Sequence, residues 1–311
     1  MRPLALSGLR IEALCACLPA RAVPNPEAVA KATGIEWRRT APAGVTAVDL
    51  CVRAAERALS DAKADRASVG AVVFVSFTQP CRMPSGAAQA QHRLGLSGEV
   101  IAFDVSLACS GWAYGLYLAS LLALQTGRRA LLLDGDVQSA FVREGDDRVG
   151  PLLGDGGSAA VIGADGRDGP AWRFAFGTDG SRGDALRLVG DGAIEMDGFG
   201  VFRFVATDVV AFLRGFLAAT GSAPADYAAF APHQPNAYMV RQLAKALGFD
   251  EAHTALTCPR FGNLSSASVP VSLAAGALRG RILAAGFGGG LSVSAADLSI
   301  DGDCRLSSVE L

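Results

Sequence analysis

Apolar positions in the first half of the chain fall into continuous runs that alternate with segments of helical spacing. Val69 to Ser76 is an unbroken, largely β-branched run, which is typical of a strand buried on both faces. A helical pattern follows it and leads to a second predicted strand, Val100 to Val105. An apolar helix that runs to Leu124 and a third strand, Arg129 to Asp134, complete an order of strand, helix, strand, helix and strand.

The second half of the chain repeats this order. A short strand, Tyr227 to Ala231, precedes a helix from Asn236 to Leu247, and Gly248 is a favourable residue to end that helix. The pattern then predicts a strand, a helix and a strand over His253 to Cys258, Ser266 to Leu278 and Arg281 to Gly286. Two copies of one order predict an α/β protein built from two halves related by a pseudo-dyad, residues 1–170 and 171–311.

Composition agrees with a large buried core and argues against several classes of protein. Of the 311 residues, 50% are hydrophobic and 19% are charged, and the formal net charge is −2. A nucleic-acid partner would normally require a basic face, and a membrane span would require about 18 uninterrupted apolar residues, which no stretch reaches. The 7 cysteines include no CxxC pair, which favours reduced thiols in a cytoplasmic protein.

Three polar residues follow predicted strands, whose carboxyl ends carry most active sites in such sheets. Cys109 lies between a strand and an apolar helix. The positive end of a helix favours a thiolate, although a packed core cysteine is the alternative. His233 lies in a turn bounded by prolines, and Asn263 lies at the mirror position to Cys109. A structural histidine and a turn-forming asparagine are the alternatives there. The pseudo-dyad predicts that Cys109 and Asn263 meet.

Two further segments invite a chemical interpretation. Phe287 to Gly290 contains three consecutive glycines, which let a backbone N–H approach a ligand oxygen closely. A phosphate loop would also need the Lys and Ser/Thr that are missing from this segment. Asp134 and Asp136 flank a glycine, and this arrangement favours a structural turn over carboxylate catalysis. No cluster of His, Cys and Asp has the spacing of a metal site.

Four segments together resemble the signature of the β-ketoacyl-acyl-carrier-protein synthase III group in the thiolase-like family. They are Ala-Cys-Ser-Gly-Trp, His-Gln-Pro-Asn, Gly-Asn-Leu-Ser-Ser-Ala-Ser and Phe-Gly-Gly-Gly, and they occur in the family's order. The similarity extends from about Leu9 to Ala295. It implies a thiolase-like fold in which the two α/β halves form layers in the order αβαβα.

By this resemblance, Cys109 takes an acyl group from a thioester such as acyl-CoA. The backbone N–H groups of Cys109 and Gly289 would form an oxyanion hole, with Phe287 beside the thiolate. His233 and Asn263 would bind the carbonyl of malonyl-acyl carrier protein and donate hydrogen bonds to the enolate that forms as carbon dioxide leaves. The resemblance implies fatty-acid, polyketide or other specialised-metabolite synthesis by a cytoplasmic homodimer. It implies no cofactor or metal besides the thioester substrates.

Two residues are expected to contact substrates or a partner. Arg148 matches the family's nucleotide-contacting arginine, and Met83 occupies the position that a dimer partner inserts at the end of the acyl pocket. The aromatic residue that stacks on the CoA adenine in typical members has no aligned equivalent, and Trp37 is merely near that position. The identity of the acyl donor and the chain length therefore stay open.

Two alternatives remain beside condensation. In the first, an acyl-Cys109 intermediate forms but a hydroxyl or amine attacks it, with His233 as the general base. In the second, the chain is a non-catalytic partner that stabilises an active subunit, and loss of the nucleophile would mark it. Cys109, His233 and Asn263 are all present, which disfavours the second alternative.

Overall fold

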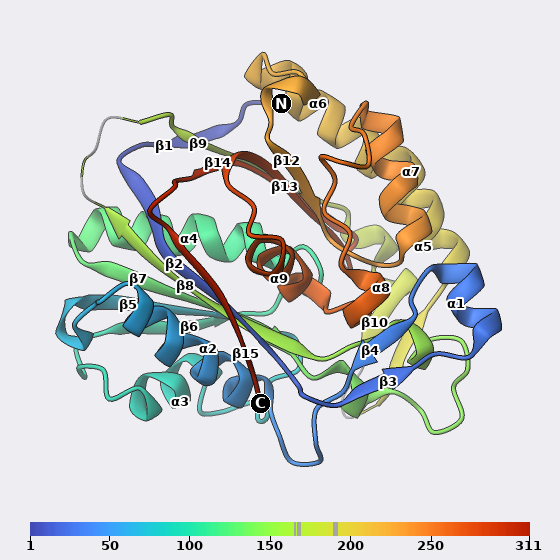
Figure 1. Cartoon of the computed structure of the whole chain (residues 1–311), viewed down its shortest axis with the longest axis horizontal. Coiled ribbons are helices and arrows are strands. Elements are labelled where there is room, and N and C mark those ends of the chain that lie inside the picture. Colours follow the sequence, from blue (N-terminus) through green and yellow to red (C-terminus); the bar gives the residue numbers. More distant parts are fainter. Residues whose placement is uncertain (165, 167–168, 189–191) are drawn as a thin grey trace.

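The computed structural model describes residues 1–311 except 165, 167–168 and 189–191. The main elements form five layers in the order helices, sheet, helices, sheet, helices (Figure 1). Helices α2 (Ala47–Asp61) and α3 (Gly86–Arg93) cover one outer face, and α6 (Val210–Thr220) and α7 (Ala237–Leu247) cover the other. The layered αβαβα architecture expected from the sequence is confirmed.

The first sheet contains six strands in the order β15-β2-β8-β7-β5-β6. Strands β6, β5 and β7 run parallel, β8 pairs antiparallel with β7, and β2 pairs antiparallel with β8. Strand β5 is buried along its whole length, as its continuous apolar run predicts. In the order β2, β5, β6, β7, β8 and β15, the strands span Leu9–Leu18, Val69–Val75, Ile101–Val105, Arg129–Asp136, Gly156–Ala164 and Arg305–Glu310.

The second sheet contains five strands in the order β1-β9-β14-β13-β12. Strands β12 and β13 run parallel, β14 pairs antiparallel with β13, and β9 pairs antiparallel with β14. This is the pattern of β5, β7, β8 and β2 in the first sheet, so the predicted repeat is confirmed. In the order β1, β9, β12, β13 and β14, the strands span Leu4–Leu6, Trp172–Thr178, Ala229–Pro232, Gly280–Gly288 and Ser292–Ile300.

Two helices fill the layer between the sheets. These are α4 (Gly111–Thr126) and α9 (Ser268–Ala275), which belong to one hydrophobic core together with residues from both sheets. Neither helix contains a charged residue, because both of its sides face a sheet and a charge there would lose its water. In Figure 1 they lie between the two sets of strands, and both begin near the centre of the molecule.

One predicted element is wrong. The segment His253 to Cys258 forms only an isolated bridge, between Thr254 and Phe230, instead of a strand. The side-chain Oε1 of Gln234 accepts hydrogen bonds from the backbone N–H groups of Thr257 (2.9 Å) and Cys258 (3.4 Å). Those donors are therefore unavailable to a sheet, and helix α8 (Cys258–Phe261) starts at once with a proline in its first turn.

The outermost strand of each sheet comes from the opposite end of the chain. β1 pairs with β9 in the second sheet, and β15, near the other end of the chain, pairs with β2 in the first sheet. Figure 1 shows the two ends on opposite sides of the molecule. The hydrogen bonding of each sheet thus includes a strand from beyond the predicted division at residues 170 and 171.

Shorter elements connect these layers. They are α1 (Glu27–Thr33), α5 (Gly198–Phe204), a π-helical turn (Val205–Val209), the pair β3 (Ala22–Pro24) and β4 (Trp37–Arg39), the pair β10 (Leu186–Leu188) and β11 (Ile194–Met196), and 3₁₀ turns at Arg66–Ser68, Gln138–Phe141, Gly150–Leu152, Gly180–Ala185, Pro224–Asp226 and Ser265–Ala267. In the part of the chain that the structure describes, no helix is both long and apolar enough to cross a membrane.

Candidate active site

Cys109 lies in a tight turn between β6 and the first residue of α4, Gly111. An idealised Cβ on Gly111 would lie 3.6 Å from the Cβ of Ser266, so the helix of the first half begins against the turn that precedes α9 in the second half. Serines of β14 hold the turn from the other side. Ser110 Oγ lies 2.6 Å from Ser292 Oγ, and Ser294 Oγ donates to the Ser110 carbonyl at 2.8 Å.

The predicted glycine segment packs directly on Cys109. A Cβ built on Gly288 would lie 2.7 Å from the Cβ of Cys109, a distance that only glycine avoids. Gly289 follows beside Ala108. Neither the backbone N–H of Cys109 nor that of Gly289 donates a hydrogen bond to another described residue, and the Cys109 N–H interacts only with its own thiol. Both donors are therefore available for the oxygen of a bound carbonyl, as an oxyanion hole requires.

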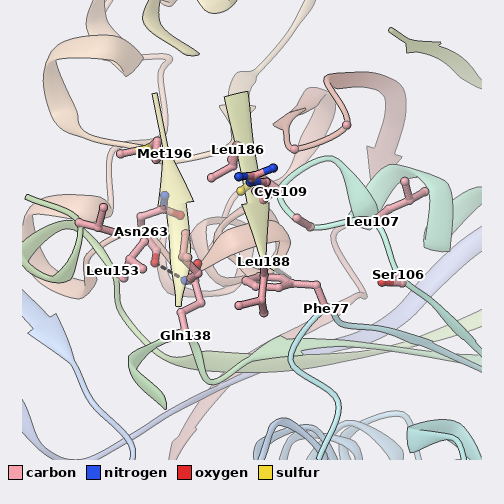
Figure 2. Close-up of a pocket in the computed structure, with 16 residues that line it drawn as sticks. Phe77, Ser106, Leu107, Cys109, Gln138, Leu153, Leu186, Leu188, Met196 and Asn263 are labelled. Atoms are coloured by element: carbon pink, nitrogen blue, oxygen red, sulfur yellow. Dashed lines mark hydrogen bonds between the residues drawn. The ribbon is translucent and has the colours of Figure 1, made fainter. Parts of the chain in front are cut away.

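Cys109, Asn263 and Gly289 line one cavity of about 330 Å³, whose surface is mostly apolar (Figure 2). The pseudo-dyad therefore brings residues of the two halves together, as the sequence predicts. Strands β10 and β11 form one wall through Leu186, Leu188, Ile194 and Met196. The other lining residues are Phe77, Ser106, Leu107, Ala108, Gln138, Val149, Leu153, Arg187 and Gly290.

Hydrogen bonds fix both the backbone and the side chain of Asn263. Its N–H donates to the Leu152 carbonyl at 2.8 Å, and its carbonyl accepts from the N–H of Gly154 at 2.9 Å. Its Oδ1 accepts from the N–H of Ser265 at 2.9 Å. Since Oδ1 is occupied, the orientation of the amide is set, and Nδ2 is the donor left for a ligand in the cavity.

His233 follows β12 and is only 2% exposed. It is not among the residues that line the cavity, and its ring lies edge-on to Phe287 at 5.3 Å between ring centroids. Its Nδ1 lies 3.0 Å from the Ser265 carbonyl and 2.9 Å from Ser268 Oγ. A carbonyl can only accept, so Nδ1 carries the proton and Nε2 is an acceptor in this arrangement.

Burial shifts the pKa of both reactive groups away from their charged forms. Desolvation raises the pKa of the Cys109 thiol to about 12, and the nearby Asp136 carboxyl adds to this rise. Desolvation also lowers the pKa of His233 to about 3, so that its imidazole is neutral at physiological pH. The sequence predicts a thiolate stabilised by the helix N-terminus. Burial of the thiol acts against that charge, so the thiolate stays a prediction.

Ser265 connects the site residues, and the sequence analysis missed it. Its N–H donates to Oδ1 of Asn263, and its carbonyl accepts from Nδ1 of His233. Its hydroxyl lies close enough to Cys109 and Asp136 to lower the pKa of each, although it forms a well-aligned hydrogen bond with neither. The backbone φ of Ser265 is +55°, a left-handed conformation that is strained for a serine. The serine-rich segment after Asn263 is the signal for this network, but its pattern predicts a regular helix.

Asp134 and Asp136 do not form the predicted turn, because both lie within β7 and are fully buried. Oδ1 of Asp136 accepts hydrogen bonds from Ser76 Oγ, the N–H of Phe77, and the N–H and hydroxyl of Thr78. Desolvation raises the pKa of Asp136 to about 6. Its role is to hold the chain after β5. No three His, Cys, Asp or Glu side chains of the described residues are grouped as a metal site would need.

The two remaining predicted residues lie outside the cavity. Arg148 is exposed and precedes Val149, which lines the cavity, so it lies near the rim. Met83 is 85% exposed, in the loop before α3. Neither touches Cys109. Trp37 lies in β4 and is also exposed.

Family models match two parts of the chain. The model of 3-oxoacyl-[acyl-carrier-protein (ACP)] synthase III matches residues 103–180, and the model of the synthase III C terminal matches residues 217–300. The first range contains Cys109, and the second contains His233, Asn263 and Gly289.

Relatives and solved structures agree with this assignment. A β-ketoacyl-[acyl-carrier-protein] synthase III of Laribacter hongkongensis is 33% identical over 292 residues, which cover 88% of this chain and 91% of that protein. The crystal structure of a 3-oxoacyl-(acyl-carrier protein) synthase from Burkholderia xenovorans has a TM-score of 0.93 and 29% identity, covering 100% of this chain and 99% of that one. The priming β-ketosynthase of the R1128 polyketide pathway has a TM-score of 0.86 and 30% identity, covering 94% and 96%.

Proposed function

The chain belongs to the β-ketoacyl-[acyl-carrier-protein] synthase III family, and we propose that it joins an acyl group to a malonyl unit by decarboxylative condensation. The acyl group comes from a thioester such as acyl-CoA, and the malonyl unit is carried by acyl carrier protein. No cofactor takes part besides these thioesters. The product serves fatty-acid, polyketide or other specialised-metabolite synthesis in the cytoplasm.

In the first step, the sulfur of Cys109 attacks the thioester carbonyl and the bond from that carbon to the donor sulfur breaks. The proton of the Cys109 thiol, whose pKa burial raises to about 12, needs an acceptor. The sulfur of the departing thiol takes up this proton, so the step balances while His233, with a pKa of about 3, stays neutral. The N–H groups of Cys109 and Gly289 stabilise the oxyanion between these events.

In the second step, the malonyl C–C bond breaks, carbon dioxide leaves and its bonding electrons form an enolate. Nδ2 of Asn263 donates to the enolate oxygen. His233 donates as well only in the tautomer with the proton on Nε2. In that tautomer Nδ1 loses its hydrogen bond to the Ser265 carbonyl, and the Ser268 hydroxyl turns from that carbonyl to donate to Nδ1. The enolate carbon then attacks the acyl carbonyl, the bond to Cys109 breaks, and the released thiolate takes up a proton.

One observation carries this proposal. A buried cysteine, two free backbone N–H donors and the amide of Asn263 share a single apolar cavity. Developing negative charge at a thioester carbonyl needs neutral donors at both the acyl and the malonyl group, and the cavity supplies both sets.

The protonation of His233 favours a second candidate. With the proton on Nδ1, Nε2 can remove a proton from a hydroxyl or amine that attacks acyl-Cys109. The outcome would be an ester or amide in place of a β-ketoacyl product, without loss of carbon dioxide. Asn263 Nδ2 has no role in that reaction, so the presence of a fixed, free Nδ2 keeps condensation first.

Intact-mass spectrometry after exposure to a panel of acyl-CoA and acyl-carrier-protein thioesters tests the first step. The wild type should gain the mass of the acyl group, and a failure with every donor would remove the enzyme proposal in favour of a partner subunit. Malonyl-acyl carrier protein is then added. A β-ketoacyl product supports condensation, whereas acylated enzyme that turns over only with hydroxyl or amine acceptors supports the second candidate.

We also propose that two copies of the chain form the working unit. β6 is an edge strand of the first sheet, with Ile101 exposed, and Met83 protrudes in the same half. Native proteins seldom leave such an edge and such a side chain in water. Sedimentation should give a dimer. If Met83 reaches the partner's pocket, Met83→Ala should shift the preferred acyl length, and an unchanged preference would refute that contact.

A further inference from the structure

Gln138 interrupts an otherwise apolar part of the cavity wall. It is 3% exposed and begins the 3₁₀ turn after β7. Its neighbours in the lining include Val149, Leu153 and Ile194, which form one hydrophobic cluster with Leu188 and Met196. Figure 2 shows Gln138 on the same side of the view as Asn263 and Leu153. A buried amide in such a wall needs partners, because an unpaired polar group is costly to bury.

The partners of this amide occupy only one of its ends. Nε2 donates to the Asn263 carbonyl at 2.7 Å and to the Gly154 carbonyl at 2.9 Å. Both N–H protons are used, and a flipped amide would place Oε1 against two carbonyl oxygens. Oε1 therefore points away from them. It accepts no hydrogen bond from the described residues, and it is not one of the fully buried side-chain atoms that lack a partner. We infer that Oε1 is accessible from the cavity that Gln138 lines.

We propose that Gln138 determines substrate specificity by accepting, through Oε1, a hydrogen bond from a hydroxyl on the acyl chain bound to Cys109. The preferred substrates are hydroxyacyl thioesters. This inference rests on the proposed function, since it assigns the acyl class used at the same site. A plain alkyl chain would fill the cavity but leave Oε1 unpaired, and a pocket built to hydrogen-bond a substrate hydroxyl discriminates against the analogue that lacks it.

A second source of the same hydrogen bond is an amide N–H of the pantetheine arm, which every CoA thioester carries. The apolar neighbours of Gln138 favour the acyl chain, because the pantetheine arm is polar along its length. The experiment separates the two sources by comparing thioesters that differ only in the acyl chain.

The test measures kcat/KM for formation of the acyl-enzyme with hexanoyl-CoA and with its 3-, 4-, 5- and 6-hydroxy derivatives. We expect the wild type to prefer one hydroxylated isomer over hexanoyl-CoA by roughly 10- to 100-fold. Gln138→Leu should reduce that ratio to about one or less. Ser106→Ala, a change at another polar residue of the lining, should keep the ratio.

Gln138→Met is the second variant, because it keeps the unbranched shape and approximate length of the glutamine side chain, which Gln138→Leu does not. Both variants lose the two hydrogen bonds from Nε2 that support the backbone near Asn263. Each ratio compares two substrates on the same protein, so a general loss of stability cancels. No preference for any isomer in the wild type, or a preference that both variants keep, overturns the proposal. An equal loss for plain and hydroxylated donors assigns Oε1 to pantetheine and also overturns it. Failure of the proposed function is distinct, since no donor would then give an adduct.

Discussion

The two halves of the chain have the same strand order but hold their reactive groups by different means. In the first half, β6 is a complete strand and Cys109 follows it in a turn that packs closely against Gly286 and Gly288. In the second half, the equivalent of β6 is a single bridge at Thr254. There, hydrogen bonds centred on Ser265 position the imidazole and the amide.

The difference follows from the tasks of the two halves. A nucleophile must approach a carbonyl carbon within contact distance, and steric packing fixes such a position well. A donor to an enolate must point at the enolate oxygen and must carry a proton on the atom that faces it. Hydrogen bonds to neighbouring backbone groups fix both the orientation and the protonated atom. In the second half, the strand is absent because the side chain of Gln234 binds its backbone and helix α8 begins early. Asn263 therefore lies in an irregular segment instead of directly after a strand.

The largest expected effect comes from removing the reactive group of the first half. Cys109→Ala should abolish acyl-enzyme formation completely, because Cys109 supplies the only thiol among the described residues that line the cavity. Decarboxylation of malonyl-acyl carrier protein should persist, since His233 and Asn263 are unaltered. Intact mass and carbon dioxide release measure the two activities. Loss of both together would show that the halves do not act separately.

The reciprocal change removes a hydrogen-bond donor of the second half. Asn263→Asp keeps an oxygen for the Ser265 N–H but replaces the free Nδ2 donor by a second oxygen. Condensation should fall by roughly 10²- to 10³-fold, the usual cost of losing one donor to developing charge. The acyl-enzyme should still form. Stopped-flow acylation and steady-state product formation separate the steps, and equal losses in both would contradict the division of labour.

A pH series sharpens the comparison, because burial shifts the two groups in opposite directions. With its pKa near 12, Cys109 is a thiol at neutral pH. The rate of its alkylation by iodoacetamide should therefore rise about tenfold per pH unit from 6 to 9. His233, with a pKa near 3, stays neutral over that range, so condensation by pre-acylated enzyme should change little. An alkylation plateau near pH 7 would show a stabilised thiolate.

The smallest expected effect tests packing around the nucleophile. Gly288→Ala places a methyl group 2.7 Å from the Cys109 Cβ, which should lower stability by about 1–3 kcal/mol and slow acylation about tenfold. Gly98→Ala is the matched control, because a Cβ there meets nothing within 4 Å. Thermal unfolding and acylation rates measure both. A Gly288→Ala protein that acylates as fast as the control would mean that this contact does not position Cys109.

Much of the fold could be predicted from the chain alone, because buried strands and helix ends leave local signals. The run at Val69–Val75 and the Gly248 end of α7 are such signals. The strand predicted over His253 to Cys258 is wrong because its backbone N–H groups bind the side chain of Gln234 instead of a neighbouring strand. The local sequence does not show that partner. The division at residues 170 and 171 stays a prediction.

Only those site residues could be predicted that lie in segments with a recognisable pattern, such as the end of a strand or a run of glycines. The meeting of Cys109 with Asn263 follows from the repeat. The network around Ser265 does not, because it depends on a left-handed backbone and on contacts between turns. Burial also acts against the thiolate expected of Cys109, and the burial of a residue cannot be derived from its place at a helix N-terminus. Gln138 gave no signal, because its partners are backbone carbonyls far along the chain.

The exchange of outer strands between the halves has a mechanical consequence. If the molecule were pulled by its two ends, tension would enter the second sheet through β1 and the first sheet through β15. β1 has three paired residues and β15 has six, so β1 should separate from its sheet at a lower force than β15. The cavity would stay intact at that stage, because neither strand lines it. A single-molecule force trace should therefore show one small early extension before the main rupture.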